Sequence, residues 1–356
     1  MKRILVTGAG GSASHNYIES LRNNHRNEKF FIIGTDVIKY HLELCHVNRS
    51  YIIPKVNNPQ YLTKLNYIIK KEKIDFLHPQ PDPEVIFLTK NKNKIAAKTL
   101  LPSYTTLTIC QNKMLLHDLL EKNSVDVPEA YHITSHKDLR SALKTLLRKH
   151  EKVWLRAIRG AGSRAALPVK SIEHAKMWIN YWQVMKGLRI QDFMVSEFLP
   201  GKEYAFQSFW INGKLIMSQA RERIEYIFGN LTPSGQSSSP SVAVTVHNDK
   251  VNELGYSAVK AIDPSATGIF CIDMKTDKKG RVVIIEINAG RFFTTSFFFS
   301  SAGLNMPYYY TKLGMGNKIN YNLKKFNNIP AGWYWVRMID MGYKLIKGER
   351  WQSMKI

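Results

Sequence analysis

The sequence predicts an α/β domain followed by an α+β region, as two patterns indicate. Over residues 1 to about 105, short apolar runs alternate with amphipathic stretches, which is typical of a small open parallel sheet covered by helices. Beyond residue 193, apolar runs follow one another through short turns, which predicts an antiparallel sheet. With 356 residues, of which 44% are hydrophobic and 22% charged, the chain is long enough for two or three domains.

The chain opens with a predicted strand, turn and helix. The apolar run at residues 4–6 ends at a cluster of glycines, which accept positive φ at no steric cost. Gly8, Gly10 and Ala13 match the G-x-G-x-x-G/A pattern of dinucleotide-binding turns, and a second apolar run, FFIIGTDV, carries Asp36 where such proteins bind ribose hydroxyls. Taken alone, this stretch predicts a Rossmann-like domain that binds NAD.

Further elements complete the first domain and lead into a second. Helices are expected in ASHNYIESLRNN and PQYLTKLNYIIKKEKI, and a strand in DFLHPQ. A boundary is expected near residues 105–112, before the leucine-rich helix in QNKMLLHDLLEK. A helix in DLRSALKTLLRKH, the strand KVWLRAI and the loop RGAGSRA follow. We therefore divide the chain into segments 1–108, 109–192 and 193–356.

The remaining segment reads mostly as strands. After a helix near 172–187, the runs FMVSEFL, KEYAFQSFWING and KLIMSQAR predict strands of one antiparallel sheet, with Asn212 and Gly213 as a hairpin turn. Two more strands, GIFCIDMKTD and RVVIIEINAG, flank a turn at 278–280. This hairpin carries the most informative polar residues of the chain.

Oxygen-bearing side chains on this hairpin predict a metal site. Glu286 and Asn288 lie two residues apart in one strand and so share a face, where Asp273 of the neighbouring strand can converge with them. Mg²⁺ prefers a few such oxygens completed by phosphate oxygens. Strands carry surface acids routinely, but burying a carboxylate in the apolar sequence VVIIEINA is costly without a cation.

A glycine-rich loop supplies a second candidate site. Arg156 ends a predicted strand, and Gly160, Gly162 and Ser163 follow in a loop whose backbone N–H groups can close over phosphates. The two candidates together indicate a nucleotide–metal site.

The order of these motifs resembles the ATP-grasp superfamily over nearly the whole chain, and most closely the ATP-binding domains of the carbamoyl phosphate synthase large subunit. The matching pieces are Lys113 in QNKMLLHDLL, Arg156 with the RGAGS loop, SEFLPGKEY, Asp273, and EIN. The resemblance implies a Rossmann-like pre-ATP-grasp domain, a small ATP-grasp subdomain and a C-terminal subdomain, which are the three segments defined above.

The resemblance also implies an activity and a role for each matching position. It implies a ligase that uses ATP and Mg²⁺, for which Mn²⁺ can substitute, to join a carboxylate to an amine or similar nucleophile through an acyl phosphate, releasing ADP and phosphate. The implied ATP contacts are Lys113 and Arg156 at the phosphates, Gly160, Gly162 and Ser163 as a lid, Glu197, Phe198 and Leu199 at the adenine, and Glu203 at the ribose. The implied metal ligands are Asp273, Glu286 and Asn288.

The chain departs from the synthase pattern after the last motif. The synthase sequence ends Glu-x-Asn-Pro-Arg, whereas this chain reads EINAGR, with Arg291 one residue later and no proline. Arg291 is the candidate, with Arg156, for stabilising the transferring phosphoryl group, and binding of substrate is its alternative role. The chain is too short for a whole synthase and shows no glutaminase-like cysteine site, so carbamoyl phosphate is not its expected product.

Candidates for substrate binding lie outside these motifs. Arg221 and Arg223 alternate on a predicted strand and could clamp a carboxylate, or they form a charged outer face with Glu222 pointing the other way. The turn at Gly10 and Gly11 belongs to a domain that, in ATP-grasp proteins, more often helps to hold the non-nucleotide substrate.

Two other classes remain as alternatives. An NAD(P)-dependent oxidoreductase would rest on the opening turn, and Tyr67 and Lys71 give a Y-x-x-x-K match, but that match falls too early in the chain. A nucleotide-binding protein without turnover is the other, although it has less need of the full set of metal ligands.

Composition limits the partners and the compartment. The net charge of +23 favours polyanions, including nucleotides and nucleic acid, but the lysines and arginines are spread along the chain, as on a solvated surface. Three scattered cysteines without C-x-x-C spacing predict neither disulfides nor zinc. No apolar run is long enough for a membrane helix and no signal peptide is evident, so a cytoplasmic protein with small-molecule or peptide substrates is expected. Self-association is left open.

Overall fold

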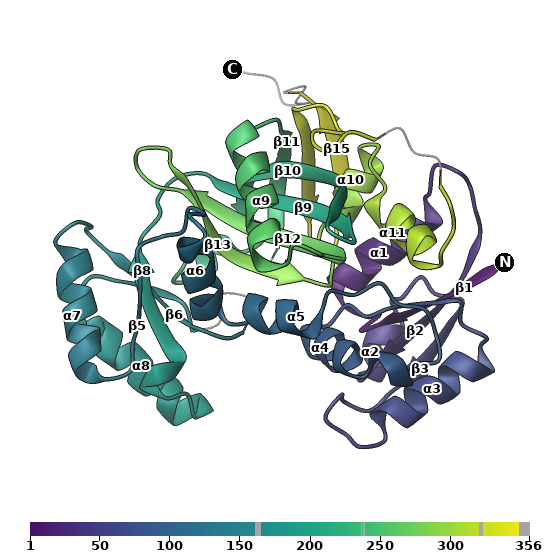
Figure 1. Cartoon of the computed structure of the whole chain (residues 1–356), viewed down its shortest axis with the longest axis horizontal. Coiled ribbons are helices and arrows are strands. Elements are labelled where there is room, and N and C mark those ends of the chain that lie inside the picture. Colours follow the sequence, from purple (N-terminus) through teal and green to yellow (C-terminus); the bar gives the residue numbers. More distant parts are fainter. Residues whose placement is uncertain (161–164, 236, 238, 320–322, 349–356) are drawn as a thin grey trace.

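The computed structural model describes residues 1–160, 165–235, 237, 239–319 and 323–348. It contains three sheets, which lie in a row along the long axis of the molecule (Figure 1). They are called here the N-terminal sheet, the small sheet and the large sheet. None of the helices in the described part of the chain combines the length and the apolar character needed to span a membrane.

The N-terminal sheet is parallel, with the order β3-β2-β1-β4, as the alternating pattern predicted. Its strands are β1 (Lys2–Thr7), β2 (Phe30–Asp36), β3 (Arg49–Ile52) and β4 (Phe76–His78). The central strand β1 is buried from Ile4 to Thr7, which explains its continuous apolar run. The helices of this region are α1 (Ser12–Arg22), α2 (Lys39–Leu42), α3 (Tyr61–Lys71) and α4 (Asp82–Lys90), with a short 3₁₀ turn at Lys92–Lys94.

Two capped helices lead out of the N-terminal domain. The helix α5 (Tyr104–Cys110) begins where the Ser103 hydroxyl accepts the Thr106 N–H, and α6 (Lys113–Lys122) begins where the Asn112 side chain accepts the N–H groups of the following turn. These side chains satisfy backbone donors that a helix end leaves unpaired. The cap at Asn112 places Lys113 in the first turn of α6.

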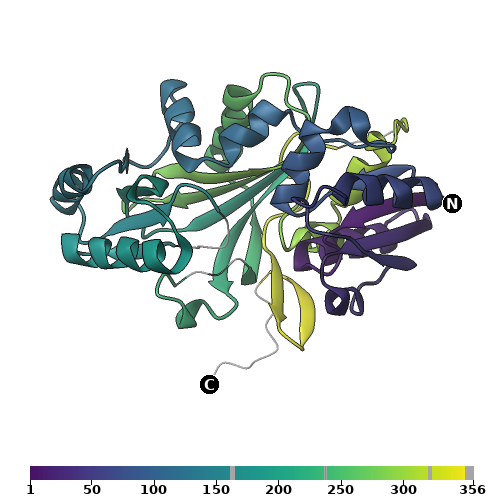
Figure 2. The ribbon, with the colours of Figure 1, turned by 90° about the horizontal axis from the view of Figure 1, so that it is seen from below.

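The small sheet is antiparallel, with the order β5-β8-β6-β7. Its strands are β5 (Ala130–His132), β6 (Val153–Ala157), β7 (Leu167–Val169) and β8 (Phe193–Glu197). The helices α7 (His136–Leu147) and α8 (Ile172–Lys186) pack beside it, and a 3₁₀ turn at Ile190–Asp192 precedes β8 (Figure 2).

The strand β8 corrects one sequence-based expectation. We expected FMVSEFL to lie in one sheet with the two strands that follow it, but β8 pairs with β5 and β6 instead. Pro200 and Gly201 interrupt the extended chain after β8, because proline lacks the N–H that a continuing ladder requires. We therefore propose that the small subdomain extends through β8 rather than ending at residue 192.

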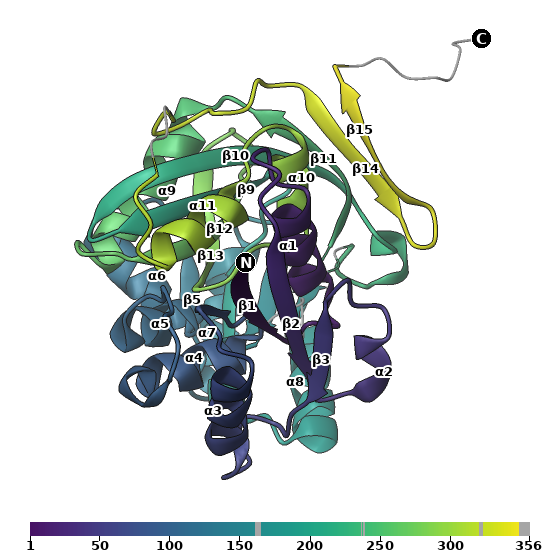
Figure 3. The same ribbon diagram turned by 90° about the vertical axis from the view of Figure 1, so that its right-hand side faces the viewer.

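The large sheet is antiparallel, with the order β13-β12-β9-β10-β11-β14-β15. Its strands are β9 (Glu203–Ile211), β10 (Lys214–Tyr226), β11 (Pro240–Val246), β12 (Gly268–Thr276), β13 (Val282–Ala289), β14 (Trp333–Met338) and β15 (Gly342–Lys347). Asn212 and Gly213 both have positive φ in the hairpin between β9 and β10, as Asn-Gly turns require. A 3₁₀ turn at Gly229–Leu231 follows β10, and the β14–β15 hairpin extends beyond the rest of the sheet (Figure 3).

The two faces of the large sheet are covered by different parts of the chain. The helix α9 (Asp249–Ile262) packs on one face, where Gly255 lies directly against the Phe206 ring. On the other side, α10 (Ser296–Ser301) and α11 (Met306–Gly314) pack against α1 of the N-terminal domain (Figure 3). Asn16 Oδ1 accepts the Phe297 N–H at 3.1 Å, and Asn305 Nδ2 donates to Ser20 O at 2.6 Å. The N-terminal domain and the large sheet thus share buried contacts.

Candidate active site

A pocket lies where the small sheet meets the edge of the large sheet that β12 and β13 form. It is lined by side chains from α6, β6, β8, β9, β10, β12 and β13 and from the segment after β13. Most residues that the sequence singled out line it: Lys113, Arg156, Gly160, Glu197, Phe198, Leu199, Glu203, Arg223, Asp273, Glu286, Asn288 and Arg291. Gly162 and Ser163 lie outside the described residues.

The oxygen-bearing residues of the hairpin meet as their spacing predicted. Asp273 of β12 lies directly opposite Glu286 of β13, and Asn288 follows two residues later on the same face. The three side chains line one wall of the pocket. This arrangement offers carboxylate and amide oxygens to one ligand, the donor set that Mg²⁺ prefers.

Cations surround Glu286. Lys113 Nζ lies 3.5 Å from Glu286 Oε2 and donates a 2.7 Å hydrogen bond to the carbonyl oxygen of Gly160. Burial alone would raise the pKa of Glu286, but Lys113, Arg156 and Arg291 outweigh burial and hold that pKa below its ordinary value. Glu286 is therefore a carboxylate in a strongly positive setting.

Arg156 is buried and has one donor without a partner among the described residues. Its Nη2 donates to the carbonyl oxygen of Ile285 at 2.9 Å, whereas its Nε has no hydrogen-bond partner among the described residues. Burial lowers the pKa of both Arg156 and Lys113, because a charged group loses water there. Leaving a buried donor unpaired costs free energy, so an anionic ligand oxygen at this place would relieve a cost that the protein already bears.

Arg223 and Asp273 form the second charged pair of the pocket. Arg223 Nη2 lies 2.5 Å from Asp273 Oδ1, and the two side chains are only 11% and 17% exposed. Burial raises the pKa of Asp273, while Arg223 opposes that shift more than any other group does. The Nε of Arg223 also lacks a partner among the described residues.

The far end of the pocket combines an acid with aromatic rings. Glu203 at the start of β9 accepts hydrogen bonds from Lys275 Nζ at 2.6 Å and from the Tyr226 hydroxyl, and these groups help to hold its pKa below the ordinary value against burial. The rings of Trp154 and Phe198 line the pocket with centroids 6.2 Å apart. An apolar slot beside a hydrogen-bond acceptor suits a planar base attached to a sugar.

Several of these residues were not identified from the sequence. Lys275 lies two positions after Asp273 on β12, so the same period-two rule places it on that face. Tyr226 is different, because irregular pairing of β10 with β11 between Arg223 and Tyr226 breaks simple alternation. Arg281, which donates to Glu197 Oε1 at 2.8 Å, carries no such signal.

The Glu197 side chain is held by hydrogen bonds within the protein. Its Oε1 also accepts the backbone N–H of Glu129 at 3.0 Å, and its side chain is only 7% exposed. The carboxylate therefore ties β8 to neighbouring segments. Glu197, Phe198 and Leu199 all line the pocket.

Arg291 connects the pocket to the N-terminal domain. Its Nη2 donates to Asn288 Oδ1 at 2.6 Å, and its Nε donates to Asp82 in the first turn of α4. Asp82 and burial act in opposite directions on Arg291, and the net effect raises its pKa. The guanidinium is thus a permanent cation beside the candidate metal ligands.

Arg221 does not reach the pocket, contrary to the joint clamp considered for Arg221 and Arg223. It is 1% exposed, lies over the Phe293 ring and donates to Thr295. The segment 292–295 covers this part of β10, which local alternation along the strand could not reveal. Arg223 alone of the two lines the pocket.

The glycine turn at residues 8–11 does not line this pocket either, so the substrate role considered for Gly10 and Gly11 stays a prediction. A Cβ at Gly8 would lie 2.4 Å from Pro81 Cγ, and one at Gly10 would lie 2.2 Å from His41 Cβ. In a dinucleotide-binding turn, the space beside the glycines is left open for the pyrophosphate. Here protein atoms fill that space.

Asp36 and the Tyr67–Lys71 match, which also supported the oxidoreductase alternative, make contacts within the protein. The Asp36 carboxylate accepts the backbone N–H groups of Gly10 at 3.1 Å and Ile38 at 3.0 Å. Tyr67 is 62% exposed on α3, with the Lys71 ammonium over its ring. Neither arrangement favours a nicotinamide site.

The crowding at Gly10 predicts a loss of stability upon substitution. We expect Gly10→Ala to lower the free energy of unfolding by about 1–3 kcal/mol, because the added methyl group overpacks against His41. Gly11→Ala is the matched control and should cost less, since its Cβ would meet only the Gly8 carbonyl oxygen, at 3.3 Å. Urea denaturation measures both, and equal costs would contradict this reading of the turn.

Comparisons with known proteins agree with this architecture. The model of the PylC-like N-terminal domain matches residues 4–101, and the model of the ATP-grasp domain matches residues 110–295. A search of curated proteins gave no significant match.

Solved structures share the fold at low identity. The biotin carboxylase domain of the Hydrogenobacter thermophilus 2-oxoglutarate carboxylase, in complex with MgADP, ADP and bicarbonate, is 14% identical, with a TM-score of 0.70 over 94% of this chain and 73% of that one. The L-amino acid ligase from Bacillus licheniformis is 13% identical, with a TM-score of 0.67 over 94% and 79%. N5-carboxyaminoimidazole synthetase from Staphylococcus aureus, complexed with ADP, is 13% identical, with a TM-score of 0.68 over 95% and 82%.

The finer likeness to carbamoyl phosphate synthase stays a prediction. The match of the ATP-grasp model covers more than half of the chain and contains the pocket, and the protein therefore belongs to the ATP-grasp family.

Proposed function

We propose that the protein is an ATP- and Mg²⁺-dependent ligase that joins a carboxylate to an amine or similar nucleophile, releasing ADP and phosphate. The observation that carries the proposal is the wall formed by Asp273, Glu286 and Asn288 with Lys113 and Arg156 beside it. Family membership supports it, as do the nucleotide complexes of proteins with this fold.

The residues of the pocket fit a magnesium nucleotide. Asp273, Glu286 and Asn288 provide the oxygen ligands of a hard cation. Lys113 and the unpaired Nε of Arg156 would hold phosphate oxygens, and Gly160 lines the pocket with them. The segment 197–199 with Trp154 would hold the base, and Glu203 would accept hydrogen bonds from the ribose.

The reaction follows from how these groups distribute charge. When bound, ATP supplies the phosphoryl group that converts the carboxylate into an acyl phosphate, from which the nucleophile displaces phosphate, and Mg²⁺ offsets the phosphate charge. Lys113, Arg156 and Arg291 present fixed positive charge where negative charge builds up, and burial strengthens their effect. Arg223, whose side chain faces the pocket, can orient an anionic group through its free Nε.

The proposal predicts Mg²⁺-dependent stabilisation by nucleotide. A non-hydrolysable ATP analogue at about 100 times its dissociation constant should raise the free energy of unfolding by about 2.7 kcal/mol, and only when Mg²⁺ is present. A thermal-shift assay measures this, with NADH and NADPH as comparison ligands. Stabilisation by NADH or NADPH and not by the ATP analogue would overturn the proposal in favour of the oxidoreductase.

Turnover distinguishes the ligase from a nucleotide-binding protein without activity. ADP release should rise well above the basal rate only when a small-molecule or peptide carboxylate and an amine are supplied together. Binding of the Mg²⁺ nucleotide without ADP release across a broad panel of such pairs would favour the binding protein.

A further inference from the structure

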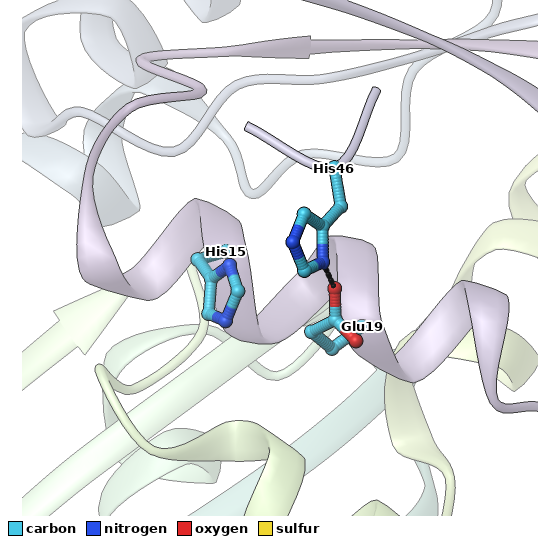
Figure 4. Close-up of side chains that lie close together, drawn as sticks. All are labelled: His15, Glu19 and His46. Carbon is cyan, nitrogen blue, oxygen red and sulfur yellow. Dashed lines mark hydrogen bonds and ion pairs between the residues drawn. The ribbon is translucent and has the colours of Figure 1, made fainter. Parts of the chain in front are cut away.

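Two histidines and a glutamate meet on the surface of the N-terminal domain, apart from the pocket. His15 and Glu19 lie one turn apart on α1, and His46 reaches them from the loop between α2 and β3 (Figure 4). One ligand atom from each residue lies within 4.8 Å of the other two. His46 Nδ1 lies 2.6 Å from Glu19 Oε1, and the two imidazole rings meet nearly edge to face, with centroids 5.5 Å apart.

The backbone beneath this cluster is held in place. His15 and Glu19 are spaced four residues apart, so regular helix geometry places them on one face. Arg22 Nε donates to the carbonyl oxygen of His46 at 2.5 Å, and Asn48 Oδ1 accepts the Ile32 N–H at 2.8 Å. These bonds fix the loop that carries His46 against α1 and β2, so little chain entropy remains to be lost when a ligand joins the side chains.

A neighbouring side chain also orients the carboxylate of the cluster. Asn23 Nδ2 donates to Glu19 Oε2 at 3.2 Å, which orients the carboxylate and leaves Oε1 toward the histidines.

We propose that His15, Glu19 and His46 form a binding site for a divalent transition-metal ion of the zinc class. Imidazole nitrogen with one carboxylate oxygen is a borderline donor set, which suits Zn²⁺, Ni²⁺, Co²⁺ and Cu²⁺ better than Mg²⁺. Three protein ligands leave a fourth tetrahedral position for water or a small anion. The ion would join the α2–β3 loop to α1 beside the glycine turn.

The geometry requires a small adjustment only. Metal–ligand bonds of about 2.0–2.2 Å place tetrahedral ligand atoms about 3.3–3.6 Å apart, whereas the present ligand atoms lie within 4.8 Å of one another. Both histidines are exposed, so rotation of their side chains can close this distance. The hydrogen bond between His46 and Glu19 would open in exchange, because both side chains would turn to the ion.

The test is Zn²⁺ binding by the full-length, untagged protein, measured by isothermal titration calorimetry after chelator treatment. We expect one Zn²⁺ per chain at this cluster, weakened at least about tenfold by His15→Ala, His46→Ala or Glu19→Gln. Co²⁺ should give the absorption bands of a four-coordinate ion, which these variants lose. Zn²⁺ should also raise the melting temperature, and EDTA should reverse that rise.

Two control variants test whether Zn²⁺ binds at this cluster and not at other side chains. Cys45→Ser removes the neighbouring thiol, which donates to the His41 carbonyl oxygen at 3.3 Å instead of joining the cluster, so it should leave Zn²⁺ binding unchanged. Glu286→Gln alters the pocket and should also leave this Zn²⁺ bound. Unchanged binding by folded His15→Ala and His46→Ala proteins, or loss of binding in Cys45→Ser, would overturn the proposal.

Discussion

Replacing Glu286 by glutamine should reduce ADP release about 10²–10³-fold while the protein remains folded. The substitution preserves the shape of the side chain but removes a carboxylate that lies opposite Asp273. It also leaves Lys113 and Arg156 without the negative charge that balances them. Both the binding of Mg²⁺ and the placement of the cations at the phosphates should suffer. Coupled-enzyme detection of ADP measures the loss.

A matched control excludes a general effect of the substitution. Glu253→Gln changes an exposed glutamate on α9 and should leave ADP release unchanged. Circular dichroism of both variants establishes that the fold is intact. If a folded Glu286→Gln protein releases ADP at the unaltered rate with the usual Mg²⁺ requirement, Glu286 is not a ligand in the proposed reaction.

Replacing Arg223 by leucine should cost about 3–5 kcal/mol of stability, because it leaves the Asp273 carboxylate buried without its partner. The pKa of Asp273 should rise further, since Arg223 is the group that most opposes the effect of burial. As the pH is lowered, Asp273 should therefore take up its proton earlier in the variant. Mg²⁺-dependent nucleotide binding should then be lost at a higher pH than in the unaltered protein. Urea denaturation gives the stability, and nucleotide titration at several pH values gives the second effect.

A double variant tests whether the ion pair between Arg223 and Asp273 accounts for the loss of stability. Arg223→Leu combined with Asp273→Leu should cost less than the two single changes added together, by about 0.5–3 kcal/mol. Lys170→Met is the control, because its pair with Glu151 is exposed at both ends and should contribute about 1 kcal/mol or less. Costs that simply add would show that Arg223 and Asp273 stabilise the fold independently.

Local sequence patterns predicted much of the fold, but they did not predict which distant segments pair with one another. The alternation of strands and helices predicted the parallel N-terminal sheet, and the Asn212–Gly213 turn predicted its hairpin. The same reasoning misplaced β8, because strand periodicity does not state which sheet a strand joins. It also gave no sign that α10 and α11 pack on α1, a contact between residues about 280 positions apart.

The site was predictable to the extent that it depends on alternation along strands. That rule brought Asp273, Glu286 and Asn288 together, and applied once more it would have found Lys275. It failed for Arg221, since only the three-dimensional path of residues 292–295 shows that this side chain is covered. The roles given to these residues rest on the family resemblance and stay predictions.

The buried hydrophobic residues form clusters that divide the molecule into two units. One buried cluster belongs to the small sheet and its helices alone, with members from Ile133 to Val195. The other two clusters each combine residues of the N-terminal domain with residues of the large sheet. Side-chain bonds of Arg156, Lys113 and Arg281 are among the links that cross from the small unit to the rest. Amide hydrogens of β5 to β8 should therefore exchange with solvent as a group, through an opening that leaves protection in β1 and β9 intact.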